Sequence, residues 1–184
     1  MNSYISNRLK QKGTFTIEFA IVGLFLSLLF VFAGDMTIKL AHKGKLDRLS
    51  YSLVNILKER TQLYGKDFQI KQSQIDSIVN IATDSLRRTV QQFEDANFGY
   101  LIEAVTFNQA QEPSYQAFAP TGTGARCQTE QTLEQMQHLS KITTWGRRAT
   151  LYRVTLCYET DNWIGDLLDM DFTTVQSDAV MIGR

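Results

Sequence analysis

The chain opens with a polar, basic segment that gives way abruptly to an apolar run. From Thr14 to Ala33 the sequence reads TFTIEFAIVGLFLSLLFVFA, 20 residues without proline, lysine or arginine. A helix of that length spans about 30 Å, which matches the hydrocarbon thickness of a bilayer. A core helix of a soluble protein rarely stays apolar on all sides for so long. The pattern therefore predicts a membrane-spanning helix.

The helical pattern continues beyond the apolar run. No proline or strong turn signal occurs between Asp35 and the pair Tyr64-Gly65, although Gly44 would permit a bend. Apolar residues recur there with steps of three and four that are typical of an amphipathic helix. They are Ile38, Leu46, Leu49, Leu53, Ile56, Leu57 and Leu63. We therefore expect one helix of about 50 residues from Thr14 to Leu63, half apolar and half amphipathic.

The rest of the chain predicts an α+β domain. Two helical patterns are expected, the long amphipathic Gln74–Phe93 and the short Thr132–Ile142. Runs rich in β-branched and aromatic residues predict three strands: Phe98–Phe107, Ala149–Glu159 and Phe172–Ile182. Glu112–Arg126, which holds both prolines, reads as a loop, and Asp161–Met170 as an amphipathic turn or short helix. This order favours a small antiparallel sheet with the long helix packed on it.

Composition and charge exclude several classes of protein. The chain is 43% hydrophobic and contains 11 Phe and 7 Tyr, enough to fill a core, so it is not disordered throughout. Its 19 basic and 19 acidic residues balance, which argues against a nucleic-acid binder. The balance hides an asymmetry, because the first 13 residues carry Arg8, Lys10 and Lys12 and no acid. The neutral total is therefore the sum of a basic amino-terminal segment and an acidic remainder.

The junction of these segments carries a motif. Gly13 ends the basic segment, and Glu18 follows five residues later with Phe19 beside it. A carboxylate in a membrane span costs a few kcal/mol and needs a partner. The arrangement resembles the signal of a type IV prepilin, and the Glu-Phe pair is most similar to the tight-adherence (Flp/Tad) branch. The resemblance implies that a prepilin peptidase cuts after Gly13, that Thr14 becomes the N-terminus, and that Glu18 neutralises a neighbouring subunit's amine during assembly.

Other interpretations of the amino terminus stay open. The apolar run is also compatible with an uncleaved signal anchor, or with a secretory signal peptide cut between Ala33 and Gly34. Glu18 is also compatible with a carboxylate tolerated near the membrane interface. Basic residues flank the run on both sides, so the positive-inside rule gives only a weak preference for orientation.

Two cysteines lie in the domain, Cys127 in the predicted loop and Cys157 in the strongest strand. A structural zinc site needs four ligands, so two cysteines cannot build one by themselves. If the domain lies outside the cytoplasm, one disulfide is the simplest interpretation. It would stabilise the fold by roughly 3–4 kcal/mol. The alternative is two free, buried thiols in a cytoplasmic domain.

Signatures of catalysis are missing from the sequence. His42 and His138 lack a partner at metal-ligand spacing, and residues 121–124 (TGTG) lack the lysine of a phosphate-binding loop. Four aspartates between Asp161 and Asp171 do not follow the spacing of a calcium loop. We therefore expect no enzymatic activity, no cofactor and no metal. The alternative is a membrane-anchored enzyme with a polar pocket that contains His138, a cysteine or the aspartate cluster.

Nearly the whole chain resembles the TadF family of minor pseudopilins in the tight-adherence (Flp/Tad) type IV pilus system. Besides the leader, the resemblance rests on Cys127, Trp145, the stretch from Tyr152 to Trp163 and the tail from Ser177 to Arg184. The sister pseudopilin TadE shares the leader and the general plan. The resemblance implies a leader over 1–13, a transmembrane helix over 14–34 and a periplasmic pilin-like domain over 35–184 of a single-pass inner-membrane protein.

The same resemblance implies a role and partners. The protein would prime or support assembly of the Flp pilus for surface attachment and biofilm formation. Its partners would be the prepilin peptidase, the major Flp pilin, a TadE-like pseudopilin and the pilus assembly machinery. A signal-peptide-cleaved periplasmic binding or adhesin domain is the alternative from another class.

Overall fold

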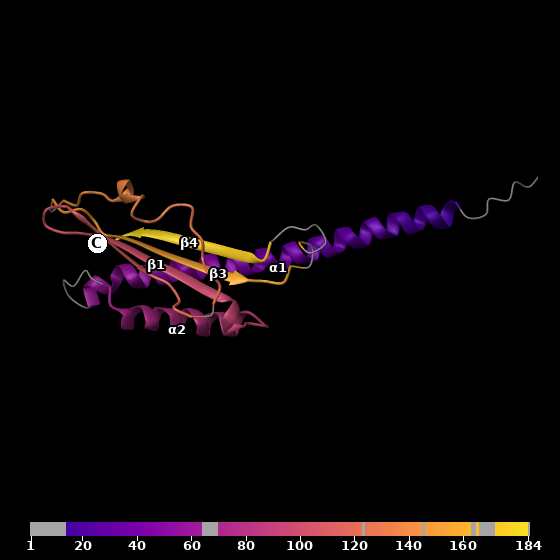
Figure 1. Ribbon diagram of the computed structural model, residues 1–184, viewed down its shortest axis with the longest axis horizontal. Helices are drawn as coiled ribbons and strands as arrows, with labels where there is room; N and C mark the ends of the chain where they lie inside the picture. The colour runs from indigo at the N-terminus through magenta and orange to yellow at the C-terminus, as the bar shows by residue number, and fades with distance from the viewer. Residues whose placement is uncertain are drawn as a thin grey trace, which may run out of the picture.

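A single helix dominates the molecule. The computed structural model describes residues 14–63, 70–122, 124–144, 146–162, 165 and 172–183. Helix α1 (Thr14–Leu63) is 50 residues long, and its amino-terminal half extends well beyond the domain (Figure 1). The helix continues through Gly44. The long helix predicted from the hydrophobic pattern is therefore confirmed at both ends.

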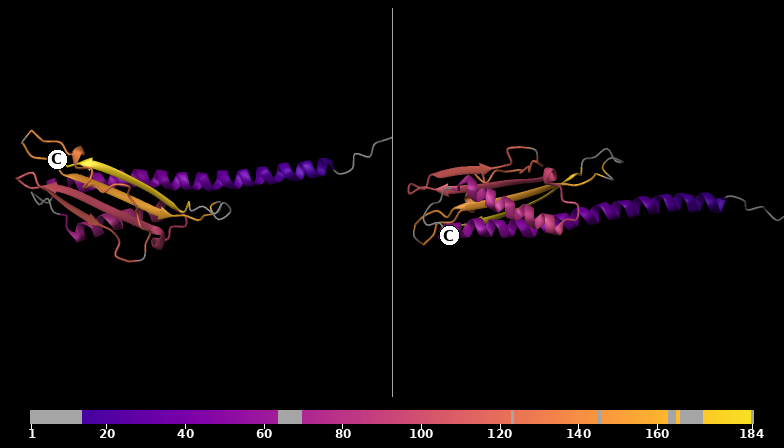
Figure 2. Two further views of the ribbon diagram at one scale, coloured as in Figure 1. Left: turned by 45° about the horizontal axis from the view of Figure 1, so that its top comes forward. Right: turned by 90° about the horizontal axis from the view of Figure 1, so that it is seen from below.

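The domain is built on one four-stranded antiparallel sheet. Its strands are β1 (Phe98–Phe107), β2 (Pro113–Phe118), β3 (Leu151–Glu159) and β4 (Thr174–Ile182), in the spatial order β2-β1-β3-β4. The carboxyl-terminal half of α1 and the second helix, α2 (Gln72–Thr89), cover one face of this sheet (Figure 2). The α+β prediction, with the long helix packed on a small antiparallel sheet, is confirmed.

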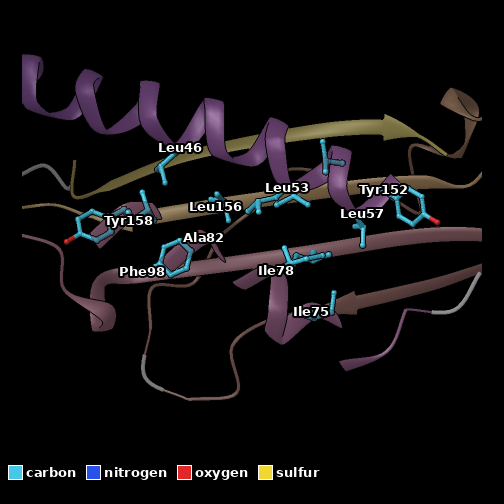
Figure 3. Packing of buried hydrophobic residues seen from close by; sticks show 14 of the residues in the cluster. Leu46, Leu53, Leu57, Ile75, Ile78, Ala82, Phe98, Tyr152, Leu156 and Tyr158 are labelled. Carbon is cyan, nitrogen blue, oxygen red and sulfur yellow. The ribbon is translucent and has the colours of Figure 1, made fainter. Parts of the chain in front are cut away.

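The main core lies between these two helices and the sheet. Strand residues alternate between the two faces, so the even-numbered side chains of β1 and β3 point toward the helices (Figure 3). The side chains buried at the centre of this core are Leu46, Leu53, Val54 and Leu57 of α1, Ile75, Ile78, Ala82 and Leu86 of α2, and Ile102, Ala104, Tyr152, Val154 and Leu156 of the strands. The amphipathic half of α1 is therefore one wall of the core.

The opposite face of the sheet is covered by the chain between β2 and β3. Val105, Leu133 and Leu151 are fully buried there and form a second, smaller apolar cluster. One turn of 3-10 helix, η2 (Gln137–Leu139), belongs to this cover. The domain thus has three layers, with helices on one face of the sheet and an irregular segment on the other.

The second helix ends earlier than the sequence predicts. We expected Gln74–Phe93, but α2 stops at Thr89 and Val90 is already extended. The Nζ of Lys45 in α1 donates to the carbonyl oxygen of Thr89, which satisfies a carbonyl at the end of the helix. Phe93 still faces the core, because the connecting segment turns it onto the ring of Tyr158, with 5.5 Å between ring centroids. The predicted apolar face is correct, while the helix that carries it is shorter.

The predicted loop over Glu112–Arg126 is wrong in its first half, because β2 occupies residues 113–118. Pro113 is the first residue of this edge strand, a position where the missing N–H costs no sheet hydrogen bond. Tyr115 lies opposite Val105 in the register with β1. The proline was therefore compatible with a strand, and the sheet has four strands where we predicted three.

The predicted helix over Thr132–Ile142 is also wrong in extent. The chain forms turns over residues 133–136 and then η2, while Ile142 is 65% exposed and forms an isolated β-bridge with Arg148. Side chains of the sheet hold this segment, because Leu133 N–H donates to the carboxylate of Glu103. Leu133, Met136 and Leu139 nevertheless face inward, as the apolar residues of such a helix would. Of the predicted element Asp161–Met170, only residues 161, 162 and 165 belong to the described part of the chain.

Candidate functional site

The amino-terminal half of α1 is an exposed apolar surface. Its large apolar side chains between Phe15 and Phe32 are between 43% and 78% exposed. Within the described residues it forms the one helix that is long and apolar enough to cross a membrane, and none of its most apolar stretch is buried in the protein. Water disfavours an apolar surface of this size, so it needs a lipid or protein environment.

Glu18 and Phe19 lie on this exposed surface, in the second turn of α1. Both side chains are exposed, and the ring of Phe19 stacks on that of Phe15 with 6.4 Å between centroids. Among the described residues, no hydrogen bond or ion pair is formed by the Glu18 carboxylate, so a group from outside them would have to neutralise it in a membrane. Gly13 and the basic leader lie outside the described residues, and Thr14 is the first residue of the helix.

The helix enters the domain at Asp35. This carboxylate is buried, and Lys39 one turn later donates to it at 2.6 Å. Beyond this pair the same helix begins to contact the strands: Lys43 Nζ donates to the carbonyl oxygen of Gln176 at 3.2 Å, and Ser177 Oγ donates to Asp47. The change from exposed helix to packed helix thus occurs between Asp35 and Leu46, because Leu40 is still 64% exposed whereas Leu46 is buried. Polar contacts join this part of α1 to β4.

Two stacked rings connect α1 to β3 two turns after Asp35. His42 lies parallel to Tyr158, with 5.4 Å between ring centroids. Burial, and to a smaller degree the charge of Lys45, lowers the pKa of His42 below its ordinary value. Tyr158 Oη also accepts a hydrogen bond from the N–H of Glu94 at 3.0 Å. His42 therefore has a packing role in this structure.

The two cysteines form a disulfide that joins the irregular layer to the sheet. The Cα atoms of Cys127 and Cys157 are 5.4 Å apart and the sulfurs are bonded. The pairing expected from the sequence is therefore present. Gly99 in β1 makes room for it, because a Cβ there would lie 1.8 Å from the carbonyl oxygen of Ala125. With both thiols in the bond, neither cysteine is available as the nucleophile of the enzymatic alternative.

The side chain of Gln176 in β4 fixes the residue after the disulfide. Its Nε2 donates to the carbonyl oxygen of Gln128 at 2.6 Å, and its Oε1 accepts from the N–H of Gln128 at 3.0 Å. This pair of bonds satisfies the backbone of Gln128 much as a neighbouring strand would. The disulfide and Gln176 together hold the irregular layer at two adjacent strands.

A buried ion pair that the sequence analysis did not identify lies beneath this layer. Glu103 is fully buried, and it accepts hydrogen bonds from Arg153 on β3, from Tyr115 on β2 and from the N–H of Leu133. Burial, with the hydrogen bond to Glu103, raises the pKa of Tyr115 above its ordinary range. A signal was present in the sequence, because a glutamate and an arginine each interrupt an otherwise apolar strand.

Both charges of the pair are hydrogen-bonded within the protein and almost completely buried. Arg153 also donates through Nη2 to the carbonyl oxygen of Gln131 at 2.8 Å. Among the described residues, no group of three or more His, Cys, Asp and Glu side chains is placed to hold a metal ion. His138 is exposed on η2, whereas Trp145, Trp163 and three of the clustered aspartates lie outside the described residues.

These features define a class of protein: a single-pass, pilin-like fold in which one long helix has an exposed apolar half and a half packed on a small sheet. The family model described as "TadF: Putative tight adherence pilin protein F" matches residues 7–184. The chain therefore belongs to the TadF family. Comparison with curated proteins finds no significant match, and neither does comparison with solved structures.

Family membership assigns the chain to the tight adherence pilus system. A pilin family implies a structural protein rather than a catalyst, and it implies contacts with other components of the pilus. The matching family model is that of TadF, the family that the sequence resembles, and not that of the sister pseudopilin TadE.

Proposed function

We propose that the chain is a minor pseudopilin that primes or supports assembly of the tight adherence (Flp) pilus for surface attachment and biofilm formation. The observation that carries this proposal is the division of α1. Its first half exposes every large apolar side chain, while its second half is a wall of the core. A helix of this kind can pack beside other pilin helices without any change in the domain.

Processing would begin at the leader. A prepilin peptidase of the inner membrane cuts after Gly13, and Thr14 becomes the amino terminus. The three basic side chains of the leader hold that end in the cytoplasm until the cut. Thr14, the residue after the cut, belongs to α1.

Assembly would then pair two charges. Glu18, residue five of the mature chain, meets the free amine of a neighbouring subunit, and each charge offsets the other's cost of desolvation. Small residues favour close approach of helices in a membrane, and Ala20, Gly23 and Ser27 recur at steps of three and four along α1. A Cβ built on Gly23 meets nothing within 4 Å, so this surface is open to a neighbour.

The domain over residues 35–184 would lie in the periplasm. The disulfide between Cys127 and Cys157 supports this side of the membrane, because disulfides persist in the oxidising periplasm and are rare in the cytoplasm. The partners would be the prepilin peptidase, the major Flp pilin, a TadE-like pseudopilin and the assembly machinery.

Mass spectrometry of the amino terminus tests the proposal. The full chain is expressed with and without the prepilin peptidase, and the mature protein is sequenced from its amino end. Thr14 as the first residue, dependent on the peptidase, is the expected result. A mature chain that starts at Gly34 would contradict the proposal and favour a secreted periplasmic domain, and an intact Met1 would leave only an anchored protein.

A further inference from the structure

A pocket lies at the end of the domain from which the exposed half of α1 emerges. Its volume is about 610 Å³, and it lies between α1, the segment after α2 and the end of β3. Figure 1 shows that α2 and β3 both end on this side of the domain, toward the exposed half of the helix. With α1 in a bilayer, this pocket would be on the part of the domain nearest to the membrane.

The wall that α1 supplies is a single stripe of side chains: Asp35, Ile38, Lys39, His42 and Lys45. The stripe starts two residues after Ala33, the end of the apolar run, and rises about 15 Å along the helix axis. The polar headgroup layer extends about 6 Å beyond the hydrocarbon on each side of a bilayer. Asp35 and Lys39, about 3 and 9 Å above the hydrocarbon along the helix, are therefore at or near headgroup height, whereas Lys45, at about 18 Å, lies about 12 Å above the headgroup layer.

The pocket carries charges of both signs. Among the described residues that line it, the cations are Lys39 and Lys45, and the carboxylates are Asp35, Glu94, Glu159 and Asp161. Lys39 is paired with Asp35, and Lys45 donates to the carbonyl oxygen of Thr89. An ammonium has three N–H donors, so one such bond does not exhaust either lysine.

The carboxylates are the larger group. Asn97 Nδ2 donates to Glu94 at 3.2 Å, while Glu159 and Asp161 are exposed at the end of β3. A purely anionic headgroup would bring a negative charge to a pocket with more carboxylates than lysines. A ligand with an ammonium alone would leave the lysines unused. A zwitterion that carries a phosphate and an ammonium complements both.

We propose that this pocket binds the headgroup of a membrane phospholipid that carries a phosphate and a primary ammonium, as phosphatidylethanolamine does. Lys39 binds the phosphate, and Glu159 and Asp161 bind the ammonium. The acyl chains run down beside the apolar half of α1, along the continuation of the same stripe. This inference rests on the proposed placement of α1 in the membrane. It adds a specific lipid contact that would set the height and rotation of the domain above the bilayer.

Native mass spectrometry of the full-length protein tests the inference. The protein is released from nanodiscs that contain equal parts of phosphatidylethanolamine, phosphatidylcholine and phosphatidylglycerol, and the retained lipids are identified. We expect phosphatidylethanolamine to be retained about tenfold over each of the others, as one well-placed charged hydrogen bond would provide. Equal retention of the three lipids, or no retained lipid, would overturn the inference.

A double variant localises the contact. Glu159→Gln with Asp161→Asn removes two carboxylates at the surface, and the preference for phosphatidylethanolamine over phosphatidylcholine should disappear. Glu130→Gln with Asp178→Asn removes two exposed carboxylates that do not line the pocket, and it should keep the preference. A preference that survives in the first variant assigns the lipid to another surface and overturns the inference.

Two further measurements separate the possible failures. Soluble glycerophosphoethanolamine should compete only weakly, because it lacks the acyl chains beside α1; competition as strong as that of the lipid would assign the pocket to a free metabolite instead. The same spectra report the amino terminus. A chain without α1 would refute the proposed function, whereas an intact, membrane-embedded chain without lipid preference would refute only this inference.

Discussion

Glu103 and Arg153 face each other across β1 and β3, and Arg153 Nε donates to Glu103 Oε2 at 2.5 Å. Both side chains are almost completely buried, at 0% and 4% exposure. Strand β2 and the irregular layer contribute the other hydrogen bonds to the pair. The pair therefore joins the sheet to the segment that covers it, and both charges depend on that cover for their hydrogen bonds.

Replacing Arg153 with methionine should destabilise the protein by about 3–5 kcal/mol, because it leaves the Glu103 carboxylate buried without its counter-ion. Thermal or urea unfolding of the full chain in detergent, followed by near-UV circular dichroism, measures the loss. Arg88→Met is the matched control, since Arg88 is exposed on α2 and should change stability by about 0.5 kcal/mol or less. Equal losses in the two variants would show that the buried pair does not stabilise the fold.

Gly99→Ala should destabilise the domain by about 1–3 kcal/mol or more, because the added methyl group would overlap the carbonyl oxygen of Ala125 and approach the sulfur of Cys157. Gly122→Ala is the control, because a Cβ there meets nothing within 4 Å. Both variants are compared by unfolding under non-reducing conditions. If Gly99→Ala unfolds with the midpoint of the control, the close approach of the disulfide segment to β1 is not present in solution.

Mild acidification should destabilise the protein, because it favours protonation of His42. Its folded-state pKa is lowered by burial and by Lys45, so the neutral ring stabilises the fold above about pH 6.5. That contribution is lost as the pH falls through the folded-state pKa. The difference in unfolding midpoint between pH 7.5 and 5.5 should therefore be smaller in His42→Gln than in the parent chain. His138→Gln, at an exposed position, should keep the parental difference; a parental difference in His42→Gln would contradict the assignment.

Glu18→Ala should reduce the yield of surface pili roughly tenfold or more, because an unpaired amine buried in the membrane costs a few kcal/mol. Shearing pili from the cell surface and quantifying the major pilin by immunoblot measures the yield. Thr16→Ala changes an exposed polar side chain in the same part of the helix and should leave piliation normal. Normal piliation with Glu18→Ala would remove the assembly role proposed for that carboxylate.

Much of the architecture was predictable because its signals are local. The bounds of α1 and of β1 coincide with the predicted bounds. An uninterrupted apolar or amphipathic period indicates both the type of element and the face that it buries. The errors occur where distant residues decide the local structure. Pro113 signals a turn when taken alone, yet it begins an edge strand because β1 supplies the partner. A helix was expected over Thr132–Ile142, but the Glu103 carboxylate accepts from Leu133 N–H and Arg153 donates to the carbonyl oxygen of Gln131, and the chain forms turns there instead.

The candidate site shows the same division. Glu18 and the apolar run could be identified from the sequence alone, because a single charge within an apolar run is apparent without knowledge of its partner. The ion pair between Glu103 and Arg153 was not, because its partners are 50 residues apart and meet only through strand register. The pocket beside Asp35 could not be found either, since its walls come from the middle of α1, the end of α2 with the segment after it, and the end of β3.

The sequence by itself determined the long helix, its apolar first half, the α+β class and the membership of the TadF family. Hydrophobic period and motif spacing are properties of neighbouring residues, and they can be identified without knowledge of the fold. The tertiary structure alone decided the fourth strand, the buried ion pair, the space that Gly99 leaves for the disulfide segment, and the charged pocket where α1 leaves the domain. Each of these depends on contacts between residues far apart in the chain, which arise only when the sheet pairs in one register and the helices pack on it.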